Sequence, residues 1–308
     1  MYEVFVDYRE DMKMTNLTAL ISTFARAYHY RNNTIHVFAD PYAGKFLSEE
    51  EYETVSHHMT QGISYFCPGF QGTKEEALQW IVEHQIAPSV LARSAFCERA
   101  LHSAVLSGCR QIIQYACGFD TFALRTENRQ LKVFELDRPE MIADKRKRLK
   151  ENGLKPVCRT DYIGCDLRDP DWREKLVRSG FDVQEQSFGT MLGLVYYLSK
   201  EEFRHLLHTA SSICPEGSAI CFDYPLIEEG KESQKNRELA AAANESMKVR
   251  YTYEEMEKML ADTGFLIYEH LNAEEADQAF FHAYNQAQPS HEMHAPQGVS
   301  YCLAVKKM

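Results

Sequence analysis

The sequence predicts an α/β fold in which a helical N-terminal segment precedes a mostly parallel β-sheet with helices on both faces. Residues 1–100 carry apolar side chains mainly at helical spacing, and from Cys109 onward short apolar runs alternate with helical patterns. Such alternation is typical of a parallel sheet between two helical layers. The last two predicted strands, Phe265–Leu271 and Tyr301–Lys307, have no helix-length crossover between them, so we expect the final strand to run antiparallel to its predecessor.

We expect a single domain over residues 1–308, with a helical cap at 1–108 and an α/β core at 109–308. In the cap, Leu17–Tyr30 has its apolar residues at helical spacing and Pro41 opens a short helix. Two longer helices are predicted at Lys74–Leu91 and Ala92–Ser107. The core carries a polar helical insertion at 226–250. The remaining core strands are predicted at Gln111–Ala116, Leu131–Asp137, Asp161–Asp166, Ser187–Gly193 and Ser218–Tyr224, and the helices between them at Phe122–Glu127, Pro139–Asn152, Asp171–Ser179 and Lys200–Ile213.

The stretch Gln111–Arg125 is the part of the core with the strongest ligand-binding pattern. A buried strand ends near Gly118, which permits a tight turn, and Asp120 and Thr121 can cap the next helix. The following strand ends at Asp137, nineteen positions after the glycine, where nucleoside-binding α/β units place an acid that accepts hydrogen bonds from ribose. On this pattern alone, Asp137 is equally well interpreted as the N-cap of the helix that follows it.

Composition excludes several classes of function. The net charge is −11 and the pI is 5.6, whereas nucleic-acid binding depends on clustered basic residues. No apolar run approaches the roughly 18 residues of a membrane helix, and the acidic, polar N-terminus does not read as a targeting peptide. Nine cysteines without CxxC pairs are typical of reduced thiols. We therefore expect a cytoplasmic protein with neither a nucleic-acid nor a membrane partner.

Ligands of open parallel sheets bind beyond the carboxyl ends of the strands. This rule selects a set of candidates: Ala116–Asp120, Asp137, Asp166, Leu192–Gly193 and Asp223-Tyr224. Tyr196, Tyr197 and Tyr224 could line a substrate pocket there or could simply pack as aromatic residues. Arg125 could meet an anionic substrate, although a surface position at a helix end is the more ordinary interpretation.

The sequence predicts neither a catalytic base nor a metal site. His205 and His208 lie on a predicted helix and are expected at the surface. His291 and His294 lie three positions apart in a Pro-flanked loop without a second ligand pair.

Six segments, in order along nearly the whole chain, give the sequence a family resemblance. They are the helix and DPYA turn within Asn16–Ser48, RSAF at 93–96, ACGFDTFALR at 116–125, FELDRPEMIADKR at 134–146, CDLRD at 165–169 before Trp172, and GLVYYL at 193–198. In this order they resemble the leucine carboxyl methyltransferase family. The resemblance implies a class I, Rossmann-like methyltransferase fold: a three-layer sandwich with a seven-stranded, mostly parallel sheet whose last strand is antiparallel.

The resemblance also implies that the cofactor is S-adenosyl-L-methionine and assigns residues to it. Arg93 would pair with the methionine carboxylate, and Ala116 and Gly118 would form the turn below the methionine and ribose. Asp137 would hold the ribose hydroxyls, and Asp166 and Leu167 would contact the adenine. The sequence departs from the family at two of its cofactor positions. Ala116 replaces a glycine, and an alanine fits that turn without strain if its φ is negative; Leu192 replaces a glutamate that makes a polar contact to the cofactor.

The resulting hypothesis is an O-methyltransferase that acts on a carboxylate or hydroxyl of a small molecule, with a protein C-terminus as the less favoured acceptor. Because a carboxylate is ionised at pH 7, it would need no base, whereas a phenol or alcohol would need one. Two alternatives stay open. The departures at Ala116 and Leu192 allow a non-catalytic binding protein, and the nucleoside-binding pattern alone allows a nicotinamide-dependent enzyme.

Overall fold

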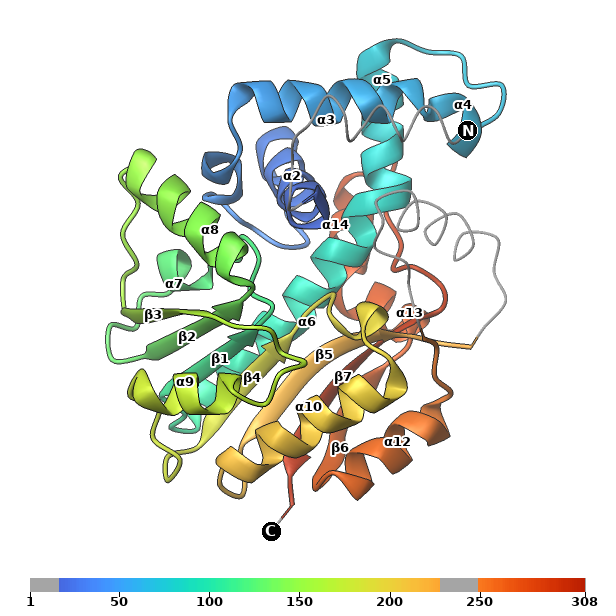
Figure 1. Ribbon diagram of the computed structural model, residues 1–308. Helices are drawn as coiled ribbons and strands as arrows, with labels where there is room; N and C mark the ends of the chain where they lie inside the picture. The colour runs from blue at the N-terminus through green and yellow to red at the C-terminus, as the bar shows by residue number, and fades with distance from the viewer. Residues whose placement is uncertain (1–16, 228–248, 308) are drawn as a thin grey trace.

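The computed structural model describes residues 17–227 and 249–307, and it contains one seven-stranded sheet (Figure 1). The strand order is β3-β2-β1-β4-β5-β7-β6. Strands β1 to β5 are parallel, and β7 lies antiparallel between β5 and β6. The fold class and the antiparallel final strand predicted from the sequence are thus confirmed. The strands are β1 (Gln111–Tyr115), β2 (Lys132–Asp137), β3 (Arg159–Gly164), β4 (Ser187–Met191), β5 (Ala219–Pro225), β6 (Phe265–Leu271) and β7 (Val299–Lys306).

Helices cover both faces of this sheet because successive side chains of each strand point to opposite sides. In β1, Ile112 belongs to the core beneath the N-terminal helices, whereas Ile113 belongs to the core beneath α9, α10 and α12. The helices of the sheet region are α7 (Phe122–Arg125), α8 (Pro139–Glu151), α9 (Trp172–Arg178), α10 (Lys200–Ile213) and α12 (Tyr253–Asp262). The result is a three-layer sandwich.

The N-terminal helices pack against one face of the sheet and over the carboxyl ends of its strands (Figure 1). They are α2 (Leu17–Asn32), the 3₁₀ turn η1 (Ala43–Phe46), α3 (Glu49–Gln61), α4 (Ile63–Phe66), α5 (Lys74–Ile81) and α6 (Ala87–Leu106). The predicted boundary between two helices at residues 91 and 92 was wrong, because α6 runs through both. The irregularity lies earlier, in the π-helical turn η2 (Val82–Ile86). It directly precedes α6, in whose first turn lies Pro88; a proline has no backbone N–H to donate and therefore favours this position.

A second difference lies between β6 and β7, where the sequence analysis expected no helix-length connection. The structure has α13 (Ala273–Ala276), the π-helical turn η4 (Asp277–Phe281) and α14 (His282–Ala287). Asn272 and Glu275 form a capping box, and Phe281 and Tyr284 are buried against the N-terminal helices. These helices return the chain to the cap side and leave β7 antiparallel. The predicted insertion at 226–250 lies almost wholly outside the described residues, and the division into cap and core stays a prediction.

Asp40 is a buried carboxylate that ties α2 to the loop after β1. Its Oδ2 accepts hydrogen bonds from Arg26 Nη1 at 2.5 Å and from the Thr121 hydroxyl at 2.8 Å. Its Oδ1 accepts from the backbone N–H groups of Tyr42 and Ala43. Arg26 also donates to the carbonyl oxygen of Phe119. These contacts fix the N-terminal helix relative to residues 119–121, which border the ligand-binding edge of the sheet.

Replacing Asp40 with alanine should therefore destabilise the whole domain. Arg26 would be left as a buried cation without its carboxylate, and breaking such a pair costs about 3–5 kcal/mol. Urea denaturation would measure the change in the free energy of unfolding. As a control, Asp262→Ala removes an exposed ion pair with Lys258 and should change that free energy by no more than about 0.5 kcal/mol. Equal effects of the two substitutions would contradict the role of Asp40.

Candidate cofactor-binding site

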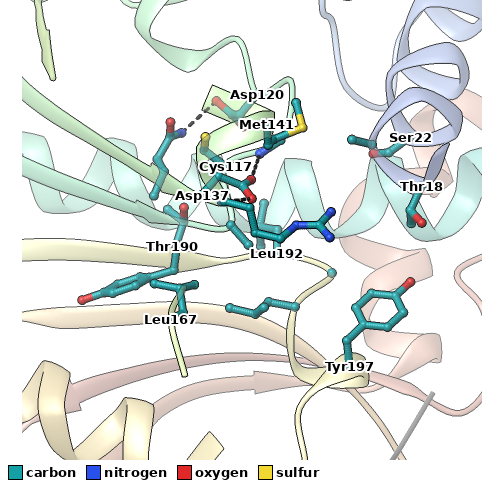
Figure 2. Close-up of a pocket in the computed structure, with 18 of the residues that line it drawn as sticks. Thr18, Ser22, Cys117, Asp120, Asp137, Met141, Leu167, Thr190, Leu192 and Tyr197 are labelled. Carbon is teal, nitrogen blue, oxygen red and sulfur yellow. Dashed lines mark hydrogen bonds between the residues drawn. The ribbon is translucent and has the colours of Figure 1, made fainter. Parts of the chain in front are cut away.

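A cleft of about 550 Å³ opens at the carboxyl ends of β1 to β4, at the point where the strand order reverses. Its volume is within the range of roughly 300–1,000 Å³ that is usual for small-ligand sites, and its position is where α/β sheets bind ligands. Figure 2 shows side chains from the sheet ends on one side of the cleft and from α2 on the other. The lining residues come from positions 114–120, 137–141, 165–168 and 190–198, together with α2 and α6.

The turn after β1 has two residues with left-handed backbone conformation. Gly118 has φ of +49° and Ala116 has φ of +53°. The alanine therefore does not have the negative φ that would make it strain-free, and this conformation costs an alanine roughly 1–2 kcal/mol. Hydrogen bonds to β2 hold the turn, because the N–H of Cys117 donates to the carbonyl oxygen of Leu136 at 3.0 Å. Ala116, which stands where the family has a glycine, thus keeps the left-handed backbone conformation that glycine favours.

Asp137 lines the cleft at the end of β2 (Figure 2). Its Oδ2 accepts a hydrogen bond from the N–H of Gly118 at 2.8 Å, and its Oδ1 accepts one from the N–H of Arg138. Arg138 is the N-cap residue of α8, and no side chain caps that helix, so the helix-cap interpretation of Asp137 was wrong. Burial raises the pKa of Asp137, although the two N–H donors oppose the shift. Each carboxylate oxygen keeps a second acceptor direction for a ligand hydroxyl.

Gln114 is a lining residue that the sequence analysis missed. Its Nε2 donates to Asp120 Oδ1 at 2.8 Å, while its buried Oε1 has no hydrogen-bond partner among the described residues. Thr190 lies beside it on β4 in the same register and also lines the cleft. Because a buried acceptor without a donor is costly, Gln114 Oε1 fits a ligand that brings an N–H or O–H group. The sequence signal was a polar residue near the carboxyl end of a strand in which only the first residue, Gln111, is also polar.

Arg93, which the family resemblance assigns to the methionine carboxylate, reaches the cleft from α6. Its Nη2 donates to the hydroxyl of Ser22 at 3.3 Å, and its Nη1 lies 3.6 Å from Asp223 Oδ2. A Cβ atom added at Gly193 would lie 2.7 Å from Arg93 Nη1. The guanidinium is therefore held between α2 and the turn after β4, with 16% of its side chain exposed.

The far end of the cleft contains Asp166 and Leu167, which follow β3. The side chain of Arg168 hydrogen-bonds the carboxylate of Asp166 and lowers its pKa to about 2, so this group is ionised at neutral pH. Leu167 and Cys165 add apolar surface next to it. Leu192 also lines the cleft, so the position of the family's glutamate is apolar in this structure.

Three predicted pocket residues lie elsewhere. The Tyr196 hydroxyl donates to Asp223 Oδ2 at 2.9 Å, and the Tyr224 hydroxyl lies 2.8 Å from His270 Nε2. Both tyrosines are buried and neither lines the cleft, so they are the packing aromatics of the alternative interpretation. Arg125 is not a surface residue; it is ion-paired with Glu98, lies 3.8 Å from Asp40 and is largely buried. Its charge supports the loop after β1.

The histidines singled out by the sequence lie away from the cleft. His205 and His208 are exposed on α10, as predicted. His291 Nδ1 lies 3.3 Å from Glu83 Oε2, and His294 Nδ1 lies 2.8 Å from Asp277 Oδ2. Within residues 17–227 and 249–307, no cluster of three or more His, Cys, Asp or Glu side chains is arranged to hold a metal ion.

Hydroxyl side chains gather at the end of the cleft opposite Leu167 (Figure 2). Thr18 and Ser22 are four positions apart and therefore share one face of α2. Tyr197 belongs to the 3₁₀ turn η3 (Val195–Tyr197) and lines the cleft, which was one of the two interpretations of this tyrosine. The α2 hydroxyls were not predicted, because the sequence does not show which face of a cap helix meets the sheet.

The sheet order and the cleft define a Rossmann-like methyltransferase fold. A crystal structure titled "putative methyltransferase" from Thermobifida fusca aligns with a TM-score of 0.56 and 16% identity, covering 94% of each chain. A DUF574 family protein from Streptomyces avermitilis aligns with a TM-score of 0.55 and 17% identity, covering 80% of this chain and 96% of the other. At such identities these similarities concern the fold.

Sequence comparison shows the family. The model of the leucine carboxyl methyltransferase family matches residues 19–211. The "Putative S-adenosyl-L-methionine-dependent methyltransferase YktD" of Bacillus subtilis is 34% identical over 306 residues, covering 95% of this chain and 98% of YktD. The chain belongs to the leucine carboxyl methyltransferase family, and its enzyme class is that of the S-adenosylmethionine-dependent methyltransferases. The predicted resemblance is confirmed. None of the described helices has the length and apolar character needed to cross a membrane.

Ala116→Gly should stabilise the protein, because it relieves the left-handed strain of an alanine. The relief of roughly 1–2 kcal/mol is partly offset by about 0.4–1 kcal/mol of added freedom in the unfolded chain, leaving a gain of roughly 0.5–1 kcal/mol. Denaturant unfolding would measure it. The same change at Ala95, inside helix α6, is the matched control and should cost about 1 kcal/mol. Destabilisation by Ala116→Gly would show that the methyl group makes compensating contacts.

Proposed function

We propose that this protein binds S-adenosylmethionine in the cleft and transfers its methyl group to a carboxylate oxygen of a small molecule. One observation carries the proposal: the cleft is lined by the carboxylate of Asp137 and by the guanidinium of Arg93, and its described lining includes no histidine, glutamate or lysine. The carboxylate and the guanidinium suit the two ends of the cofactor. A described lining without histidine, glutamate or lysine favours an acceptor that is already ionised.

The lining residues suit the parts of the cofactor in turn. Asp137 would accept hydrogen bonds from the ribose diol, and Asp166 with Leu167 would contact the polar edge and the face of the adenine. The planar guanidinium of Arg93 suits the methionine carboxylate. The unpartnered Oε1 of Gln114 suits the α-ammonium group and would supply a polar contact that Leu192 cannot make. When bound, the cofactor supplies a methyl group on a cationic sulfur that leaves as a neutral thioether.

The protein's own task is to position the acceptor and exclude water. Leu192, Leu194 and Leu198 line the cleft near Tyr197 and give that end apolar walls. The hydroxyl groups there can donate hydrogen bonds without adding charge. A reaction of this kind needs alignment in a dry site rather than acid–base chemistry when the nucleophile is already ionised.

The titratable groups of the cleft favour such an ionised acceptor. Burial raises the pKa of Cys117 and of Cys165, so both thiols stay neutral at pH 7. Asp120 is buried and already accepts from Gln114 and from the N–H of Phe122. Asp137 and Asp166 line the end of the cleft that we propose for the nucleoside. The described lining therefore offers no group placed to deprotonate a phenol or alcohol, which favours a carboxylate with an ordinary pKa near 4.

Cofactor binding can be tested by isothermal titration calorimetry with S-adenosylhomocysteine and with NAD. We expect micromolar binding of the former and none of the latter. Asp137→Ala should lower the affinity for S-adenosylhomocysteine at least about tenfold, because hydrogen bonds to a charged partner contribute roughly 1.5–3 kcal/mol. Asp171→Ala, an exposed aspartate after β3, is the control and should have no effect. Binding of NAD alone, or unchanged affinity of Asp137→Ala, would contradict the assignment.

The acceptor class can be tested with radiolabelled S-adenosylmethionine and pairs of small acceptors that share a carbon skeleton, one a monocarboxylate and the other a phenol or alcohol. We expect label to enter the carboxylates, at a rate independent of pH between about 6 and 8, because the acceptor is fully ionised there. The product should release methanol in mild base, as a methyl ester does. A base-stable product formed from the phenol or alcohol would refute the carboxylate proposal and leave the cofactor assignment intact.

A further inference from the structure

We propose that Asp223, a buried residue at the end of β5, is a positioning residue that orients Arg93 for the amino-acid end of the cofactor. This inference rests on the proposed function. Leu192 stands where the family has a glutamate, so this chain lacks a carboxylate at the end of β4. The described structure offers a carboxylate one strand further along the sheet.

The contacts of Asp223 link three separate elements. Its Oδ1 accepts a hydrogen bond from the N–H of Gly193 at 2.7 Å. Its Oδ2 accepts from the Tyr196 hydroxyl at 2.9 Å and lies 3.6 Å from Arg93 Nη1. One fully buried side chain thus holds the turn after β4, the η3 turn and the guanidinium from α6.

Arg93 needs such a partner because it is poorly solvated. Within the described part of the chain, Asp223 is the acidic residue at ion-pair distance from it. An unpaired, mostly buried cation would be costly and would turn towards water. Asp223 lies behind the guanidinium and is fully buried, whereas Arg93 lines the cleft. The pair therefore fixes the direction in which Arg93 presents its remaining N–H groups to a ligand.

The surroundings of Asp223 reinforce this arrangement. Burial and the charge of Asp223 raise the pKa of Tyr196 well above its ordinary value, so its hydroxyl remains a donor. Gly193 has φ of +64°, and its missing Cβ makes room for the guanidinium. The same carboxylate therefore holds the cation and the turn that covers it. No contact of Asp223 with the reacting atoms is involved, so its effect must pass through Arg93.

The test compares two ligands that differ in the amino-acid part. S-adenosylhomocysteine carries the carboxylate and 5′-deoxy-5′-methylthioadenosine lacks the amino-acid end, and calorimetry gives the affinity for each. Asp223→Asn keeps an acceptor for Gly193 but places an NH₂ group towards Arg93. We expect its affinity for S-adenosylhomocysteine to fall about tenfold or more, and that for methylthioadenosine to change less than about twofold. Arg93→Ala should show the same selectivity, and the double variant should bind no more weakly than Arg93→Ala alone.

Tyr196→Phe is the matched control, because it removes another donor to Asp223 while leaving the charge pair intact; its ligand selectivity should equal that of the wild type. Equal losses for both ligands in Asp223→Asn, or a further loss in the double variant, would overturn the positioning role. Wild-type protein that binds neither ligand would instead refute the proposed function. If Asp223→Asn does not fold, Asp223→Glu is measured in its place, because it keeps the charge but displaces it. A larger loss of affinity for S-adenosylhomocysteine than for methylthioadenosine would support the positioning role, and equal losses would overturn it.

Discussion

The hydrogen bond from the N–H of Gly118 to Asp137 is the interaction on which the site depends. It joins the turn after β1 to the end of β2 and so fixes the floor of the cleft. The turn can be strained at Ala116 because this bond and the one from Cys117 to Leu136 over-determine its backbone. A carboxylate that both holds the loop and lines the cleft preorganises the site for a ligand.

Asp40 and Asp223 follow the same physical logic at other edges of the cleft. Each is fully buried, accepts a backbone N–H from a turn, and lies beside an arginine from a cap helix. A carboxylate has two oxygens with several acceptor directions, so one side chain can satisfy a turn and a cation together. Buried pairs of this kind contribute little net stability compared with apolar packing, but they fix orientation, and orientation is what a cofactor site requires.

Local patterns were enough to predict the strands, the order of elements and the acid at Asp137, because strand periodicity and the spacing from Gly118 are properties of neighbouring residues. Contacts made across the fold were not predictable in this way. Arg125 looked exposed from its place at a helix end, yet Asp40 and Glu98 bury it from other elements. Tyr224 belongs to the correct strand end, but its side chain turns to His270 rather than to the cleft. The positions of Gln114 and Ser22 in the cleft were not predicted, because they depend on which face of a strand or helix the neighbouring layer covers.

The replacement of a glutamate by Leu192 removes one negative charge from the lining of the cleft, although other carboxylates remain there. The buried carboxylate of Asp223 balances the charge of Arg93, and Leu192 gives the cleft an apolar wall. An apolar wall lowers the local dielectric and strengthens the remaining interactions of Arg93 with a ligand carboxylate. It also removes a negative charge that would repel an anionic acceptor. The same substitution that first argues against catalysis is therefore consistent with transfer of a methyl group to a carboxylate.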